Sequence, residues 1–152
     1  YSYMFGTKKG VFAGLIYGVL QAVQDPWIIH PAQFMLDYPV AFAGIGLAGL
    51  FANAKKLEKL PQIQFALGAV VASAFRFVSH VLSGVFAFSA YAAEAGMEVW
   101  VYSLGYNSFV FVDVAVVIAA GVLAFSSPSL VKQARRFNVA ERKREEKAET
   151  QE

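Results

Sequence analysis

Four long runs of apolar residues constrain this chain more than any other feature of its sequence. They cover residues 10–24, 32–52, 62–92 and 98–125, and short segments that carry proline or charge separate them. A helix rises about 1.5 Å per residue, so roughly 20 apolar residues cross the hydrocarbon core of a bilayer. The sequence therefore predicts an all-α integral membrane protein, a bundle of about four visible transmembrane helices in one domain.

The composition agrees with a membrane protein and excludes several other classes. Hydrophobic residues make up 57% of the 152 residues and charged residues 16%, and the net charge of +2 is too small to suggest a nucleic-acid partner. The absence of cysteine excludes disulfides and thiolate ligands. His30 and His80 form no H-E-x-x-H pair, and neither a phosphate-binding loop nor a nucleophile elbow occurs. We expect no enzyme, no metal site and no cofactor.

Basic residues gather at alternate ends of successive apolar runs, at Lys8, Lys9, Lys55, Lys56, Lys59, Lys132, Arg135 and Arg136. The opposite loops carry Asp25, Glu94 and Glu98 without lysine or arginine. The positive-inside rule places the basic ends in the cytoplasm, which predicts a multi-pass protein of the cell membrane. Residues 1–137 then form the bundle, and residues 138–152 form a charged cytoplasmic tail that carries the C-terminus.

Polar and aromatic residues recur at similar depths in these runs. Counted from the outer face at about 1.5 Å per residue, Phe88 and Tyr102 lie roughly 6 Å deep, Asp37 about 8 Å, Tyr17 about 10 Å, Asn107 about 14 Å and His80 about 18 Å. Polar groups are costly inside a bilayer, so such a cluster indicates a ligand pocket that opens outward. Asp37 in particular needs a positive partner, a proton or a cationic ligand.

Each of these residues also has a purely structural interpretation. A histidine or asparagine in a membrane bundle often joins helices by hydrogen bonds, which is as good an account of His80 or Asn107 taken alone. Tyr17 and Phe88 taken alone are typical of packing. Together with Asp37 they suggest a site for a flat cation, held by a carboxylate and by ring faces.

Five motifs resemble one known family. They are Gly14-Leu-Ile-Tyr-Gly-Val-Leu, Gln33-Phe-Met-Leu-Asp-Tyr-Pro-Val-Ala-Phe, Gly46-Leu-Ala-Gly-Leu-Phe, His80-x-x-x-Gly84 and Tyr102-Ser-Leu-x-x-Asn107. As a set, over about residues 8–137, they resemble the thiamine-specific substrate-binding subunit (S-component) of energy-coupling-factor (ECF) vitamin transporters. Any one motif would be a weak signal.

The resemblance implies a ligand, partners and a site. The ligand is thiamine, and the partners are the ECF transmembrane coupling subunit and its ATPase subunits. Asp37 and Tyr38 are implied to contact the thiazolium side, His80, Tyr102 and Asn107 to hydrogen-bond the vitamin, Gly84 to leave room for it, and Tyr17 and Phe88 to supply aromatic walls. Some relatives carry tryptophan at both aromatic positions and glutamate at the acidic one, so this chain has smaller rings and a shorter acid.

The resemblance also implies a six-helix fold, of which this chain holds the last four helices and lacks the N-terminal helix and a half. The first function hypothesis is a subunit that captures extracellular thiamine for uptake driven by a separate ATPase module. A non-transport structural or assembly protein is the alternative, as is an S-component for a related vitamin or pyrimidine precursor. The sequence does not separate thiamine from its phosphates.

Two further predictions concern charged residues. Arg76 and Asp113 lie at equal depth on successive helices, about 23 Å below the outer face, which predicts an ion pair that closes the pocket floor. The alternative is that each side chain extends separately toward the basic surface. Residues 92–97, with Glu94 and Gly96, lie above the proposed pocket and are predicted to act as a gate, with a plain connector as the alternative.

Overall fold

The fold is entirely helical over the residues that the structure, a computed structural model, describes: 1–24 and 26–150. Asp25 and residues 151–152 lie outside this part of the chain. The α-helices are α1 Ser2–Phe5, α2 Thr7–Gln24, α3 Pro31–Met35, α4 Ala41–Ala43, α5 Pro61–Ala87, α6 Ser89–Glu94, α7 Val99–Asn107, α8 Val110–Phe125 and α9 Pro128–Glu149. A π-helical turn η1 (Leu36–Val40) and two 3-10 segments, η2 (Gly44–Gly49) and η3 (Lys55–Leu57), complete the set. The predicted all-α class is confirmed.

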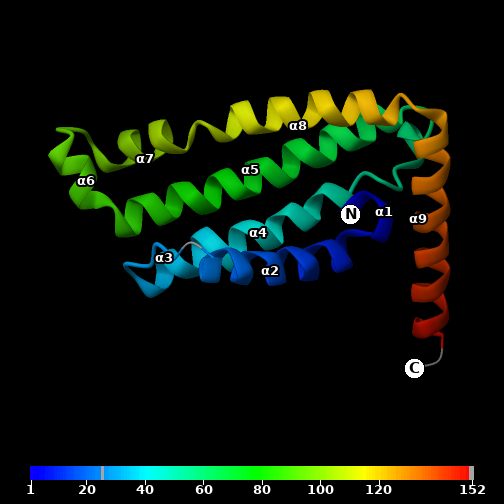
Figure 1. Ribbon diagram of the computed structural model, residues 1–152, viewed down its shortest axis with the longest axis horizontal. Coiled ribbons are helices and arrows are strands. Elements are labelled where there is room, and N and C mark those ends of the chain that lie inside the picture. The colour runs from blue at the N-terminus through cyan, green and yellow to red at the C-terminus, as the bar shows by residue number, and fades with distance from the viewer. Residues whose placement is uncertain (25, 151–152) are drawn as a thin grey trace.

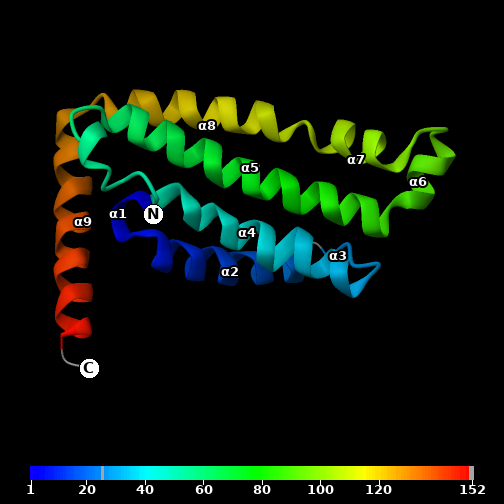
Figure 2. The same cartoon turned by 180° about the vertical axis from the view of Figure 1, so that it is seen from behind.

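The long helices lie side by side, and α9 crosses one end of them at a steep angle (Figures 1 and 2). Helix α5 packs against α8 on one side and against the segment that runs from η1 to η2 on the other. The N-terminus lies near α9, whereas α3 and α6 lie toward the opposite end (Figure 1). The bundle therefore has a basic end, where α9 lies, and an end that carries the predicted outer loops.

Two helical stretches are long and apolar enough to cross a membrane by length and composition, Pro61–Ala87 and Val99–Phe125. The second apolar run of the sequence is divided among α3, η1, α4 and η2. The third run is divided at Phe88, whose φ of −116° and ψ of 22° end α5 before α6 begins. Helix α9 continues through residue 138, where the predicted tail starts. The count of four spans stays a prediction.

Helix α2 approaches the η1–η2 segment closely because glycines form its contact face. A Cβ atom at Gly14 would overlap the Phe42 carbonyl oxygen, and one at Gly18 would overlap the Tyr38 carbonyl oxygen. The two glycines are four residues apart, so they lie on the same face of α2. Small residues of this kind let helix backbones meet in membrane bundles. The contact places Tyr17, which precedes Gly18, beside the segment that carries Asp37.

A small buried cluster joins α9 to the basic end of the bundle. The Tyr3 ring packs edge-on against Phe125 with centroids 4.7 Å apart, and its hydroxyl donates to Gln64 Oε1 at 2.9 Å. The Asn138 side-chain amide of α9 donates to the Tyr3 carbonyl at 3.1 Å. Burial raises the pKa of Tyr3, an effect that the nearby positive charge of Arg135 partly opposes. These contacts set the direction in which α9 crosses the bundle.

Candidate functional site

Asp37 lies in the π-helical turn η1, which follows α3 without a break. Pro39 lies inside this turn and has no N–H to donate, so regular α-helical bonding is interrupted there. Ser79 Oγ of α5 donates to the Leu36 carbonyl at 2.6 Å and so connects the turn to α5. Single π turns are frequent at functional sites because they redirect a side chain. Here the turn directs Asp37 toward His80, the residue after Ser79.

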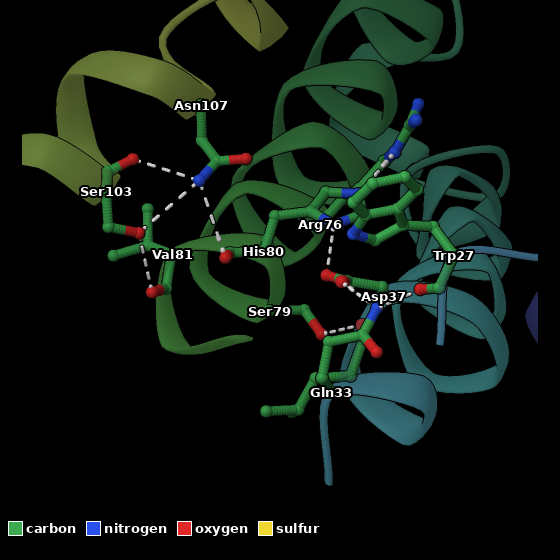
Figure 3. A network of polar contacts seen from close by, with 10 residues as sticks. Trp27, Gln33, Asp37, Arg76, Ser79, His80, Val81, Ser103 and Asn107 are labelled. Carbon is green, nitrogen blue, oxygen red and sulfur yellow. Dashed lines mark hydrogen bonds and ion pairs between the residues drawn. The ribbon is translucent and has the colours of Figure 1, made fainter. Parts of the chain in front are cut away.

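The Asp37 carboxylate is held on both of its oxygens (Figure 3). His80 Nδ1 lies 2.9 Å from Oδ1, and Gln33 Nε2 donates to Oδ2 at 2.8 Å. The His80 and Asp37 side chains are 18% and 19% exposed, so the pair is partly shielded from solvent. A carboxylate offers about four lone-pair positions, so two donors leave capacity for a further donor or a cation. The structure thus brings together two of the predicted site residues.

Arg76 decides the protonation pattern of His80. Arg76 Nε donates to His80 Nε2 at 3.2 Å, and arginine has no acceptor to offer in return. His80 Nε2 must therefore accept, so we assign the ring proton to Nδ1, where it is donated to Asp37. Arg76 is four residues before His80 on α5, and its guanidinium carbon lies 5.2 Å from the centroid of the buried Phe42 ring. Two successive hydrogen bonds thus connect the Arg76 guanidinium to the His80 imidazole and the imidazole to the Asp37 carboxylate.

The predicted ion pair between Arg76 and Asp113 is wrong. Arg76 faces His80 and Phe42 instead, and the Asp113 residue of α8 is exposed. Equal depth along two helices fixes only the axial position of a residue. It does not fix the face of the helix on which the side chain lies, and Asp113 lies on an exposed face of α8.

Gln33 is a central residue of the site that the sequence analysis did not select. It is 1% exposed, and both ends of its side chain are engaged. Besides the bond to Asp37, its Nε2 donates to the Trp27 carbonyl at 2.9 Å, and its Oε1 accepts from Ile29 N at 3.2 Å. Its spacing of four residues from Asp37 on a helical run was the available signal. Gln33 couples the loop between α2 and α3 to the carboxylate.

Asn107 and Gly84 lie where α5 meets α7. Asn107 Nδ2 donates to the Ser103 carbonyl at 2.9 Å and lies 3.4 Å from the His80 carbonyl, and Ser103 Oγ donates to the Val81 carbonyl at 2.8 Å (Figure 3). A Cβ atom at Gly84 would overlap Ser103 Oγ. Because Gly84 has no side chain, α7 packs closely against α5 in this structure. A contact of Gly84 or Asn107 with a ligand stays a prediction.

Tyr17 and Tyr38 lie on the Asp37 side of the site. The Tyr17 ring meets the Phe42 ring edge-on at 5.0 Å, and Phe42 also contacts Arg76. The Tyr38 hydroxyl accepts from Trp27 N at 3.1 Å, so it binds the same loop that Gln33 binds. Tyr17 is thus linked to the Asp37–His80 pair through Phe42 and Arg76. Tyr38, the residue after Asp37, is linked to it through Trp27 and Gln33.

Phe88 and Tyr102 are not joined to Asp37 or His80 by any ring contact or hydrogen bond among the described residues. Phe88 lies 5.8 Å from the Tyr91 ring, and Tyr102 stacks on Tyr106 with centroids 6.1 Å apart. Both residues lie toward the end of the bundle that carries α6, beyond His80 along α5 (Figure 1). Their placement around a ligand stays a prediction.

The loop between α6 and α7, which is one of the predicted outer loops, is a tight, capped turn. Gly96 has a φ of +65°, a conformation that favours glycine, and the Glu98 carboxylate accepts from the backbone N–H groups of Trp100 and Val101 at 2.8 and 3.1 Å. Glu98 thus caps α7. A proline at Gly96 would break this turn, since its ring fixes φ near about −65°. The predicted gating role of residues 92–97 stays a prediction.

A shallow, open hollow of about 390 Å³ lies near the site and is lined by Ile28, Ile29, His30, Pro31 and Phe34. None of the predicted site residues lines it, but the Phe34 ring lies 5.9 Å from that of Tyr38. Among the described residues no group of three or more histidines and acidic residues could hold a metal. Within the site, the Asp37 carboxylate is the group with acceptor capacity left for a further donor or a cation.

Comparison with known proteins identifies relatives over most of the chain. The family described as thiamine transporter protein (Thia_YuaJ) matches residues 1–133. The thiamine transporter ThiT of Bacillus subtilis (strain 168) is 35% identical over 140 residues, which cover 86% of this chain and 72% of the relative. The thiamine transporter ThiT of Lacticaseibacillus paracasei (strain ATCC 334) is 33% identical over 137 residues, which cover 82% of this chain and 68% of the relative. No solved structure gives a significant match.

Proposed function

This chain belongs to the thiamine transporter protein family, and we propose that it is the thiamine-binding membrane subunit of an ECF-type importer. The relatives are named as transporters, so the family is one of membrane transport proteins and not of enzymes. The observation that carries the proposal is the Asp37–His80 pair. The Asp37 carboxylate of η1 contacts His80 of α5 and has acceptor capacity left for one more positive group.

Thiamine has a permanent positive charge and two aromatic rings. In the proposed complex Asp37 balances the thiazolium charge, and Tyr17, Tyr38 and Phe88 cover the ring faces. Gly84 leaves room for the ligand beside α5 once the Ser103 side chain, which occupies that space in this structure, moves aside. His80, Tyr102 and Asn107 recognise the aminopyrimidine through its donors and acceptors. Both His80 nitrogens have partners in this structure, so a bond from the ring to thiamine replaces one of them.

Transport in this proposal needs further chains. The site faces outward and the C-terminus lies in the cytoplasm, as the distribution of lysine and arginine supports. No phosphate-binding loop occurs in the sequence, so the energy comes from separate ATPase subunits through an ECF coupling subunit.

A second candidate, a structural or assembly protein, is favoured by one observation. Asn107, Ser103 and Gly84 already form a complete contact between α5 and α7, so Asn107 does not need a ligand to satisfy its amide N–H groups. Such a protein would keep its stability without binding thiamine.

Equilibrium binding of radiolabelled thiamine to the detergent-purified full-length protein separates the two candidates. We expect saturable binding that Asp37→Asn weakens roughly 10- to 150-fold, because a hydrogen bond to a charged group contributes about 1.5–3 kcal/mol. Asp113→Asn is the matched control, since it makes the same chemical change at an exposed position of α8. Absence of saturable binding, or equal loss in both variants, would reject the thiamine site.

Competition tests the remaining ligand alternatives. A neutral analogue that lacks the thiazolium charge should compete poorly with thiamine on the wild type and better, in relative terms, on Asp37→Asn. An unchanged preference would show that Asp37 is not the counter-charge. Stronger competition by a pyrimidine precursor than by thiamine would assign the subunit to that ligand instead.

A further inference from the structure

An open groove of about 990 Å³ lies at the basic end of the bundle, far along α5 from Asp37. Its lining residues come mainly from the start of α5, the end of α8 and from α9. These three segments meet at one end of the bundle (Figures 1 and 2). The residues that line it on α9 include Lys132, Arg136, Val139 and Lys143. Their spacing of three or four residues puts them on one face of the helix. The face of α9 that lines the groove is therefore mostly basic.

The described residues that line the groove carry charge of a single sign. Its described lining contains five cationic residues and no aspartate or glutamate: Lys59, Lys132, Arg135, Arg136 and Lys143. Arg135 is fixed in place, because its guanidinium donates to the Glu58 carbonyl. The lysines at 59, 132 and 143 and Arg136 are exposed and can reach a ligand. Such a surface is suited to an anion with several oxygen acceptors.

Apolar residues share the same groove. Pro61, Phe125 and Val131 line it next to the cations, and Phe125 is the last residue of α8. The groove thus lies at the ends of both stretches that are long and apolar enough to cross a membrane. At that position along the bundle a bilayer changes from acyl chains to headgroups. A ligand that matches the lining has an anionic head and an apolar body.

We propose that this groove binds the headgroup of an anionic phospholipid, with α9 lying along the membrane surface above it. The basic ends of membrane helices face the leaflet that is rich in anionic lipid. A free phosphate would bind the cations but would leave the apolar residues of the groove without a partner. An acidic protein segment would not explain why the groove lies at the ends of the spanning helices. This site is independent of the proposed thiamine site.

Native mass spectrometry of the detergent-purified full-length protein tests the proposal. The probes are phosphatidylglycerol, phosphatidylcholine with the same acyl chains, glycerol phosphate, which has the anionic head without the chains, and a polyglutamate peptide. The variant Lys132→Gln/Arg136→Gln removes two exposed charges of the groove. Lys55→Gln/Lys56→Gln is the matched control, because it removes two exposed charges from η3 that do not line the groove. Circular dichroism checks that each variant keeps its helix content.

We expect the wild type to prefer phosphatidylglycerol to phosphatidylcholine and to bind glycerol phosphate weakly. The groove variant should bind phosphatidylglycerol about 30-fold more weakly, because each lysine or arginine near an anionic surface contributes about 1 kcal/mol, while the control keeps most of its affinity. Equal binding of the two lipids, or equal losses in the two variants, would overturn the proposal. Tighter binding of glycerol phosphate than of lipid would assign the groove to a soluble phosphate, and tighter binding of a polyglutamate peptide would assign it to a protein partner.

Discussion

Arg76 Nε lies 3.2 Å from His80 Nε2, and this contact orients the imidazole that faces Asp37. Since arginine can only donate, the neighbouring nitrogen accepts, and the proton of the ring is left for the carboxylate. A positive and a negative side chain thus share one neutral histidine. The arrangement holds Asp37 in place without a direct cationic partner, which keeps its charge available to a ligand.

The contact between Arg76 and His80 predicts which pairs of mutations change the unfolding free energy non-additively. The losses of unfolding free energy caused by Arg76→Gln and His80→Ala should be non-additive by about 1 kcal/mol, since the two residues share a hydrogen bond. Arg76→Gln and Asp113→Asn should instead add within about 0.5 kcal/mol, because these residues do not touch. Chemical unfolding in detergent measures both cycles. Strong coupling of Arg76 to Asp113 would restore the ion pair that the structure excludes.

Gln33 should matter for stability as well as for binding. In Gln33→Leu the Trp27 carbonyl and one Asp37 oxygen lose their donor, and Ile29 N loses its acceptor. We expect a loss of about 1–3 kcal/mol in unfolding free energy from these unsatisfied groups. Gln24→Leu, at an exposed position near the end of α2, is the control and should stay within about 0.5 kcal/mol of the wild type. Equal effects of the two changes would contradict the network.

Two glycines on facing helices should respond in opposite directions to alanine. Gly84→Ala introduces a Cβ that overlaps Ser103 Oγ, so it should destabilise the protein by about 1–3 kcal/mol. Gly105→Ala adds a methyl group where no atom lies within 4 Å, inside α7, so it should be neutral or stabilise by about 0.5–1 kcal/mol. Melting temperatures in detergent show the difference. A stable Gly84→Ala variant would mean that α7 packs less closely on α5.

Tyr3 predicts a loss of stability in alkali. Its pKa is raised above the usual 10.0, mainly by burial, so the unfolded chain gives up the phenolic proton before the folded chain does. The contribution of the neutral hydroxyl is complete below pH 10 and is lost as the pH rises through the pKa of the folded state. Tyr3→Phe should therefore flatten the pH dependence of unfolding above pH 10. Tyr106→Phe, at a side chain 72% exposed, is the control that should leave it unchanged.

Two residues of the candidate site, Asp37 and His80, could be predicted from the free-energy cost of placing polar groups in apolar helices. A carboxylate in an apolar run cannot be left without a partner, which singled out Asp37 before any partner was known. The same reasoning selected His80, which proved to be that partner. It could not select Gln33, because an amide is less expensive to bury than a charge and attracts less notice. The role of Gln33 depends on which loop folds over it.

The sequence by itself determined the class of this protein and the axial position of its polar residues. Apolar runs require a membrane or a core, and helical rise converts residue number into depth. Only the tertiary structure decided which residues meet, because a contact also depends on how each helix is rotated about its axis. That rotation is set by packing, by Gly14 and Gly18 against the η1–η2 segment and by Gly84 against α7. Arg76 therefore faces His80, whereas Asp113, predicted to lie at a similar depth, is exposed.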